Sequence, residues 1–136
     1  MDYLAVAIAG FLGAISRAAL GKAIKAMAVM VFPLGTLIIN LTGCFILSFF
    51  LTLTLDRLEI NPKLRLAIGT GFLGAYTTFS TFAVDSISLI RSQQILVSAA
   101  YILGTSLGCV VLAWIGAATS KALTTERGDT EAETSE

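Results

Sequence analysis

Long apolar runs without a charged residue alternate with short charged segments along the chain. Three such runs are Ala26–Leu55, Leu66–Val84 and Ser92–Ser120, and a fourth begins at Tyr3 and is interrupted by Arg17. A transmembrane helix needs about 20 mostly apolar residues. The pattern therefore predicts an all-α membrane protein with four transmembrane helices, over Tyr3–Lys25, Pro33–Leu55, Pro62–Ile90 and Gln93–Thr119.

The residues at the ends of these runs support the same helices. Pro33 and Pro62 stand where the second and third helices should begin, and Asn61 is a suitable N-cap. Basic residues follow the first apolar run instead of preceding it, so we expect a retained span and not a signal peptide. We expect residues 1–120 to form the membrane domain and residues 121–136 an acidic, disordered tail.

Composition excludes several function classes. Of 136 residues, 56% are hydrophobic and 13% are charged, and the net charge is zero, so nucleic acid is not an expected partner. The chain has no His, the usual general base, so we do not expect an enzyme. Cys44 and Cys109 lie in apolar runs without C-x-x-C spacing, which gives no sign of a redox motif, zinc site or disulfide.

Basic residues divide almost evenly between the two membrane faces. With four spans, both termini and the middle loop share one face (face A), which carries Arg57, Lys63, Arg65, Lys121 and Arg127. The opposite face (face B) carries Arg17, Lys22, Lys25 and Arg91. Orientation follows an excess of Lys and Arg on one side. The near balance predicts a chain that inserts in both orientations.

Polar side chains within the spans collect in the half nearer face B. At 1.5 Å per residue Asn40 lies about 10 Å below face B. Thr36 shares its helical stripe, and Tyr101 reaches a similar depth with Thr105 deeper. An Asn amide has two donors and two acceptors to satisfy, so we expect Asn40 to line a pathway.

Three features in or near the spans can each be interpreted in two ways. Arg17 either lines this region or extends to face B, and Asp85 either lines it or caps a helix near the surface. Gly104 and Gly108 form a G-x-x-x-G pattern, which favours a close helix contact over a binding site.

The third span contains an unusual segment, residues 69–82, with three glycines and four threonines. Such a segment either breaks near the membrane midplane or forms a tight glycine-mediated helix crossing without a break. Carbonyls freed by a break would be hard oxygen ligands for a small cation. Phe79 and Phe82 lie on one helix face, and their electropositive ring edges beside Asn40 could hold an anion without a full charge.

These residues resemble the CrcB/Fluc family of bacterial fluoride channels over about residues 4 to 118. The similarity rests on motifs in all four spans: Gly10-x-x-Gly13-Ala14-x-x-Arg17, Pro33-x-Gly35-Thr36-x-x-x-Asn40-x-x-Gly43, Gly71-Phe72-Leu73-Gly74-x-x-Thr77-Thr78-Phe79-Ser80-Thr81-Phe82, and Tyr101. The resemblance implies passive fluoride efflux across the bacterial inner membrane that relieves fluoride toxicity. It also implies an antiparallel dual-topology homodimer with two pores at the subunit interface.

The resemblance also implies roles for single residues. Asn40, Phe79 and Phe82 match pore positions, Tyr101 and Thr105 match the polar track, and Arg17 matches a vestibule position. Backbone carbonyls of Gly74 and Thr77 match positions that hold a structural central sodium ion (Na+). The chain departs from the family in having Ala75 after Gly74, and Asp85 in place of the usual Glu.

Combining the resemblance with the residue chemistry gives a mechanism. We expect the Asn40 amide, the hydroxyls of Thr36, Thr81 and Thr105, and the Phe ring edges to replace part of the fluoride hydration shell. A proton-coupled small multidrug exporter is one rival, but it needs a titratable acid deep in the first span, where the sequence has only Asp2 at its edge. A membrane scaffold protein without transport activity is the other rival.

Overall fold

A computed structural model describes residues 2–27, 31–56 and 60–133, and these residues form helices without a strand. The predicted all-α class is confirmed for this part of the chain. In chain order the segments are α1 (Asp2–Met27), α2 (Leu34–Asp56), α3 (Pro62–Leu66), the π-helix η1 (Ala67–Leu73), α4 (Gly74–Tyr76), α5 (Phe79–Arg91) and α6 (Ile95–Glu133).

Three helical stretches among the described residues are long and apolar enough to cross a membrane, namely Tyr3–Met27, Leu34–Leu55 and Ile95–Leu123. They correspond to the first, second and fourth predicted spans. Large apolar side chains such as Phe11 and Trp114 are exposed on their outer faces. Exposed apolar surface of this extent suits contact with lipid or with another apolar protein face.

Local sequence explains where several helices begin. Asn61 caps α3 as predicted, because its side-chain oxygen accepts a hydrogen bond from the Lys63 N–H at 2.9 Å, and Pro62 occupies the first turn. The turn between α5 and α6 is tight, with Gln93 at a positive φ of 60°. Its N–H donates to the Ile90 carbonyl at 3.0 Å, which closes the end of α5.

The third predicted span is helical on both sides of a two-residue break. α3, η1 and α4 follow one another from Pro62 to Tyr76, whereas Thr77 and Thr78 are extended and α5 begins at Phe79. The prediction of a break is confirmed, and the unbroken alternative is wrong. The break falls after the glycines, since the segment that contains Gly69 and Gly71 remains helical as a π-helix.

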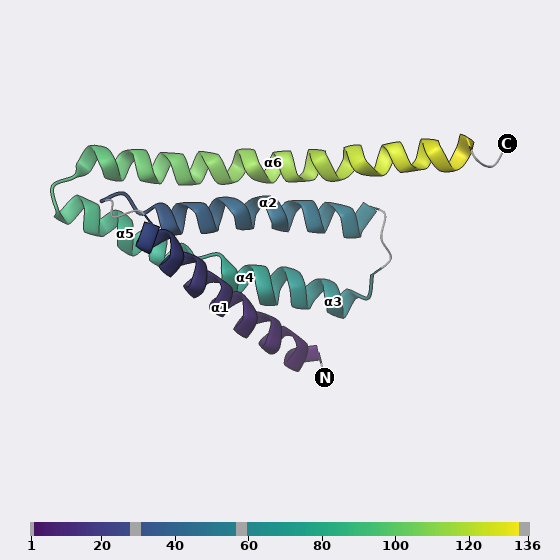
Figure 1. Cartoon of the computed structure of the whole chain (residues 1–136), viewed down its shortest axis with the longest axis horizontal. Helices are drawn as coiled ribbons and strands as arrows, with labels where there is room; N and C mark the ends of the chain where they lie inside the picture. Colours follow the sequence, from purple (N-terminus) through teal and green to yellow (C-terminus); the bar gives the residue numbers. More distant parts are fainter. Residues whose placement is uncertain (1, 28–30, 57–59, 134–136) are drawn as a thin grey trace.

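The helices α2 and α6 pack in parallel, and α1 crosses the helical segment that precedes the break. α2 and α6 lie side by side and run in the same direction, while α1 crosses η1 and α4 obliquely (Figure 1). Gly108 on α6 faces the Leu41 side chain, but a Cβ at Gly104 would meet nothing within 4 Å in the described part of the chain. The predicted close contact of the G-x-x-x-G pattern therefore holds only at Gly108 inside one chain.

The last helix is longer than predicted. α6 continues to Glu133, so residues 121–133 are helical where the sequence suggested a disordered tail (Figure 1). The acidic tail includes Ala132 and several Glu residues, which are good helix formers. A helix already held against α2 supplies the nucleus that an isolated tail would lack.

Candidate functional site

The side chain of Thr78 caps the N-terminus of α5, directly after the break between α4 and α5. Its Oγ1 accepts a hydrogen bond from the Thr81 N–H at 3.2 Å and donates to Thr81 Oγ1 at 3.0 Å. This is the N-cap arrangement that satisfies an unpaired amide at the start of a helix. The extended Thr77–Thr78 pair is therefore a defined structure that starts α5 in a new direction.

Asn40 on α2 holds the break from the other side. Its Nδ2 donates to the Thr78 carbonyl oxygen at 3.0 Å, and its Oδ1 accepts from the Thr78 N–H at 2.9 Å. The Asn40 side chain thus pairs with Thr78 as a neighbouring β-strand would, and it is only 8% exposed. Gly43 lets α2 come this close, because a Cβ there would overlap the Thr77 methyl group.

Because of these hydrogen bonds, two backbone carbonyls do not receive the N–H donors that they would have in a continuous helix. In an unbroken helix the Thr78 N–H would bond to the Gly74 carbonyl, and the Thr81 N–H would bond to the Thr77 carbonyl. Here these two donors bond to Asn40 Oδ1 and to Thr78 Oγ1. These are the two carbonyls that the family resemblance matches to a cation site, and their usual helical donors are bonded elsewhere.

A second polar cluster joins α2, α5 and α6. Thr36 Oγ1 donates to Asp85 Oδ2 at 2.7 Å, and the Tyr101 hydroxyl lies 3.4 Å from the same oxygen, a long and weak contact. Tyr101 is 0% exposed, and its ring packs between Phe32 and Phe82. Asp85 is therefore a half-buried carboxylate whose Oδ2 contacts the hydroxyls of Thr36 and Tyr101.

The two predicted phenylalanines do lie together, but they differ in exposure. Their ring centroids are 5.7 Å apart at 44°, and Phe82 also lies 5.3 Å from the Tyr101 ring. Phe79 is 80% exposed. Phe82 is therefore partly buried against Tyr101, whereas Phe79 is largely exposed.

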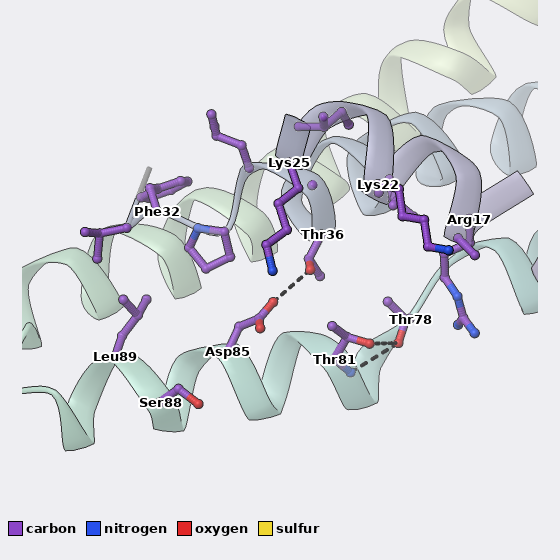
Figure 2. A pocket seen from close by; sticks show the side chains of 18 of the residues that line it. Arg17, Lys22, Lys25, Phe32, Thr36, Thr78, Thr81, Asp85, Ser88 and Leu89 are labelled. Atoms are coloured by element: carbon purple, nitrogen blue, oxygen red, sulfur yellow. Dashed lines mark hydrogen bonds between the residues drawn. The ribbon is translucent and has the colours of Figure 1, made fainter. Parts of the chain in front are cut away.

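Two cavities meet at Thr78, which lines both. The larger, about 650 Å³, is open and collects the basic side chains of α1 opposite polar groups of α2 and α5. Its charged and hydroxyl-bearing lining residues are Arg17, Lys22, Lys25, Thr36, Thr78, Thr81, Asp85, Ser88 and Ser92. Figure 2 shows Lys25 extending from α1 toward Asp85 and Thr36. We call this cavity the basic cavity.

The smaller cavity, about 310 Å³, lies between α2, the break and α6. Its lining includes Asn40, Phe79, Phe82 and Thr105, together with Cys44 and Cys109. Thr105 is 5% exposed, and its Oγ1 has no hydrogen-bond partner among the described residues. A buried hydroxyl without a partner is a donor available to whatever enters the cavity. We call this cavity the inner cavity.

The parallel packing of α2 and α6 aligns their polar residues in pairs. Ser48 Oγ donates to the Ala113 carbonyl at 2.7 Å across a separation of 65 residues, and the same separation relates Thr36 to Tyr101 and Asn40 to Thr105. Thr36–Tyr101 and Asn40–Thr105 are four residues, about one helical turn, apart, and Ser48–Ala113 follows two turns later. We call this set of facing pairs the α2–α6 ladder.

The structure thus brings the predicted site residues into two adjoining groups. Arg17, Thr36, Thr81 and Asp85 line the basic cavity, whereas Asn40, Thr77, Phe79, Phe82 and Thr105 line the inner one. Tyr101 lines neither cavity, but its ring packs against Phe82 and its hydroxyl contacts the Asp85 carboxylate. Gly74 is exposed at the start of α4, three residues before the break, and lines neither cavity.

Sequence reasoning did not select several residues that the structure places at the site, among them two lysines and two cysteines. Lys22 and Lys25 were counted only as face B charges, and Cys44 and Cys109 only as apolar residues. A signal for the cysteines was available, because each lies four residues after a selected residue, Asn40 or Thr105. Thr78 was seen as part of the break, although its contact with Asn40 could not be deduced from spacing.

Apolar helices long enough to span a bilayer, a broken helix and cavities lined by hydroxyl, amide and basic groups define an integral membrane protein with features of a transport pathway. The sequence pattern described as "CrcB-like protein, Camphor Resistance (CrcB)" matches residues 4–117. The chain belongs to the CrcB family, as the sequence motifs predicted, and it is a multi-pass membrane protein.

Similar proteins cover three quarters or more of the chain. A fluoride-specific ion channel, FluC 2, of Geobacillus kaustophilus is 44% identical over 121 residues, which is 89% of this chain and 94% of that protein. FluC 2 of Carboxydothermus hydrogenoformans is 46% identical over 102 residues, 75% of this chain and 74% of that protein. FluC 1 of Moorella thermoacetica is 43% identical over 111 residues, 82% and 79% of the two chains. These relatives are named as channels and not as enzymes.

Proposed function

We propose that this chain is a fluoride channel that lets cytoplasmic fluoride leave a bacterial cell passively through its inner membrane. The observation that carries the proposal is the identity of 44% with a fluoride-specific channel across 94% of that protein's length. The pathway would run from the basic cavity past Thr78 to the inner cavity. The sequence between Tyr3 and Lys25 contains no Asp or Glu, which argues against a proton-coupled exporter.

The energetic problem for such a channel is to replace the water around a small anion. In the inner cavity the replacements are the Thr105 hydroxyl, the Asn40 N–H that does not bond to Thr78, and the electropositive edges of Phe79 and Phe82. None of these groups carries a full charge, so each holds an anion weakly. Weak sites allow the ion to leave as well as enter.

Basic side chains attract anions to the entrance of the proposed pathway. Arg17, Lys22 and Lys25 line the basic cavity and raise the local concentration of anions there (Figure 2). Asp85 offsets part of this positive charge. Its Oδ2 accepts from Thr36, so the carboxylate is partly shielded from an arriving anion.

The stretch from Pro62 to Arg91 would be the fourth membrane span. The helical part before the break has 15 residues and α5 has 13, which correspond to roughly 22 Å and 20 Å at 1.5 Å per residue. The two lengths together exceed a hydrocarbon core of about 30 Å. A break between segments of similar length lies close to the membrane midplane.

The channel would be an antiparallel homodimer with two pores at the subunit interface. One chain collects its polar groups in the half nearer face B, and an inverted copy would supply the other half. Phe79, 80% exposed, and the exposed Gly74 are features of a surface that a second copy covers. The division of basic residues, five on face A and four on face B, allows both orientations.

The carbonyls of Gly74 and Thr77 fit the structural sodium ion that the family resemblance implies. Their usual helical donors bond elsewhere, and carbonyl oxygens of unwound helices are suitable sodium ligands. Two carbonyl oxygens are few for one sodium ion, so two copies facing each other would hold the ion together. When bound, the ion would add positive potential near the pathway without a buried Lys.

Fluoride efflux from liposomes that contain the purified chain tests this proposal. With potassium inside and valinomycin present, a fluoride electrode should record rapid efflux that does not change when a pH gradient is imposed. Efflux that requires the pH gradient would indicate an exporter, and no efflux would contradict the proposal. The matched control is Asn40→Ala, which removes one proposed contact and should conduct poorly.

Topology is tested separately with a protease site inserted after Lys121. In sealed vesicles an added protease should cleave about half of the copies if both orientations are present. Complete cleavage or complete protection, in vesicles that still conduct fluoride, would contradict the antiparallel dimer and leave the channel function standing.

A further inference from the structure

The two cysteines of the chain form one pair of the α2–α6 ladder. Cys44 and Cys109 are 65 residues apart, as are Ser48 and Ala113, and they follow Asn40 and Thr105 by one helical turn. The Cys44 and Cys109 side chains stand on the adjacent helices α2 and α6 and border the same small cavity. Both cysteines are free thiols and both are partly buried.

The surroundings of this thiol pair are those of a binding site. Both cysteines line the inner cavity of about 310 Å³. The Thr105 hydroxyl lines the same cavity, is on a residue only 5% exposed, and has no partner among the residues described. The lining of this open cavity therefore joins two soft sulfur ligands and an available polar group.

The number of ligands limits which metal ion fits. In the described ranges no three His, Cys, Asp or Glu side chains come together, so a four-coordinate zinc site cannot be built here. Two facing thiols suit a soft cation that accepts two sulfur ligands in a line. A divalent ion bound to two thiolates is neutral, which avoids the cost of a net charge among apolar helices.

We propose that Cys44 and Cys109 together bind one soft divalent cation of the Hg²⁺ type. Both S–H bonds break and two Hg–S bonds form, so one Hg²⁺ and two thiols give one neutral bis-thiolate complex and two released protons. No oxidant or reductant takes part. The bound ion lies beside Asn40, Phe82 and Thr105, and it obstructs the anion pathway there, a consequence that rests on the proposed channel function.

Binding is measured on the full-length protein in detergent, kept reduced and then freed of reductant. Mass spectrometry after addition of excess Hg²⁺ and removal of the weakly bound ion should find one ion per chain. Cys44→Ser and Cys109→Ser should each weaken binding about hundredfold or more, because each leaves one thiol of the pair. Two ions per chain, or unchanged affinity in either single variant, would overturn the thiol-pair site.

A matched control distinguishes Hg²⁺ binding by a pair of thiols from Hg²⁺ binding by a single thiol in the same cavity. Ser106 also lines the inner cavity, so Ser106→Cys in the double variant Cys44→Ser/Cys109→Ser provides one thiol there. This variant should bind Hg²⁺ no better than the single serine variants. Binding as tight as that of the unmodified chain would show that pairing is irrelevant and would contradict the proposal.

The obstruction is tested in proteoliposomes, with each preparation compared with its own flux before mercury. The unmodified chain should lose at least about nine-tenths of its fluoride flux when one Hg²⁺ binds, and a small dithiol chelator should restore the flux. Unchanged flux at full occupancy would refute the obstruction. A preparation that binds one ion per chain but never conducts fluoride would support the thiol-pair site and contradict the channel function.

Discussion

Replacing Asn40 by Ala would test how the break between α4 and α5 is held. The substitution removes two hydrogen bonds, of 3.0 and 2.9 Å, and leaves the N–H and C=O of Thr78 without them. A buried backbone group left unpaired costs about 1–3 kcal/mol, so the two groups together cost about 2–6 kcal/mol. Thr78 lines two cavities that can admit water, which favours the lower end of that range.

Hydrogen exchange of the Thr78 amide measures this cost directly. A loss of about 2 kcal/mol of protection corresponds to exchange about 30-fold faster in Asn40→Ala. The amide of Leu89, in the same helix α5 but away from the break, reports opening of the whole helix and should change much less. We expect fluoride flux to fall by at least about tenfold as well, because one anion-facing N–H is lost.

Two further variants separate the roles of Asn40. Asn40→Asp keeps an oxygen that can accept from the Thr78 N–H, so this amide should stay protected while flux falls. Ser98→Ala removes a buried hydroxyl that donates to the Ser86 carbonyl at 3.1 Å, outside both cavities, and should change neither readout. Thr78 exchange in Asn40→Ala equal to that of the unmodified chain would show that the side chain does not hold the break.

Three other substitutions test separate parts of the structure. Phe82→Ile should fold but lower fluoride flux about tenfold or more, because the ring edge is lost; unchanged flux would remove the ring-edge argument. Gly13→Ala should destabilise the protein by about 1–3 kcal/mol, since its Cβ would overlap the η1 backbone, whereas Gly104→Ala meets nothing within 4 Å in the described chain and serves as its control. Thr36→Val should lower stability by about 1.5 kcal/mol through loss of the 2.7 Å bond to Asp85, and an unchanged melting temperature would contradict that bond.

The helices were predictable because their causes are local. Length, absence of charge and the Asn61-Pro62 start are properties of consecutive residues, and the structure reproduces them in α1, α2 and α3. The exact position of the break was harder to predict from the sequence. Glycine weakens a helix by about 1 kcal/mol, but Gly71 remains helical because it packs against Val6 of α1. The break lies instead at Thr78, where Asn40 supplies replacement hydrogen bonds.

The candidate site was predictable as a set of residues at similar depth but not as a set of contacts. Helix rise placed Thr36, Asp85 and Tyr101 in one half of the membrane, and the structure brings all three to one carboxylate oxygen. The Asn40–Thr78 pairing joins residues 38 positions apart, and no local pattern encodes such a contact. The placement of Cys44 and Cys109 at one cavity likewise depends on the parallel alignment of α2 and α6 (Figure 1).

That alignment limits how these two helices can change length during evolution. A single-residue insertion or deletion within α2 or α6 would rotate everything beyond it by about 100°. Every later pair of facing residues would separate at once, including the Ser48–Ala113 hydrogen bond. Substitutions at one pair leave the other pairs in place, so variation along these helices should occur by replacement, with changes of length confined to the connecting loops and the end of α6.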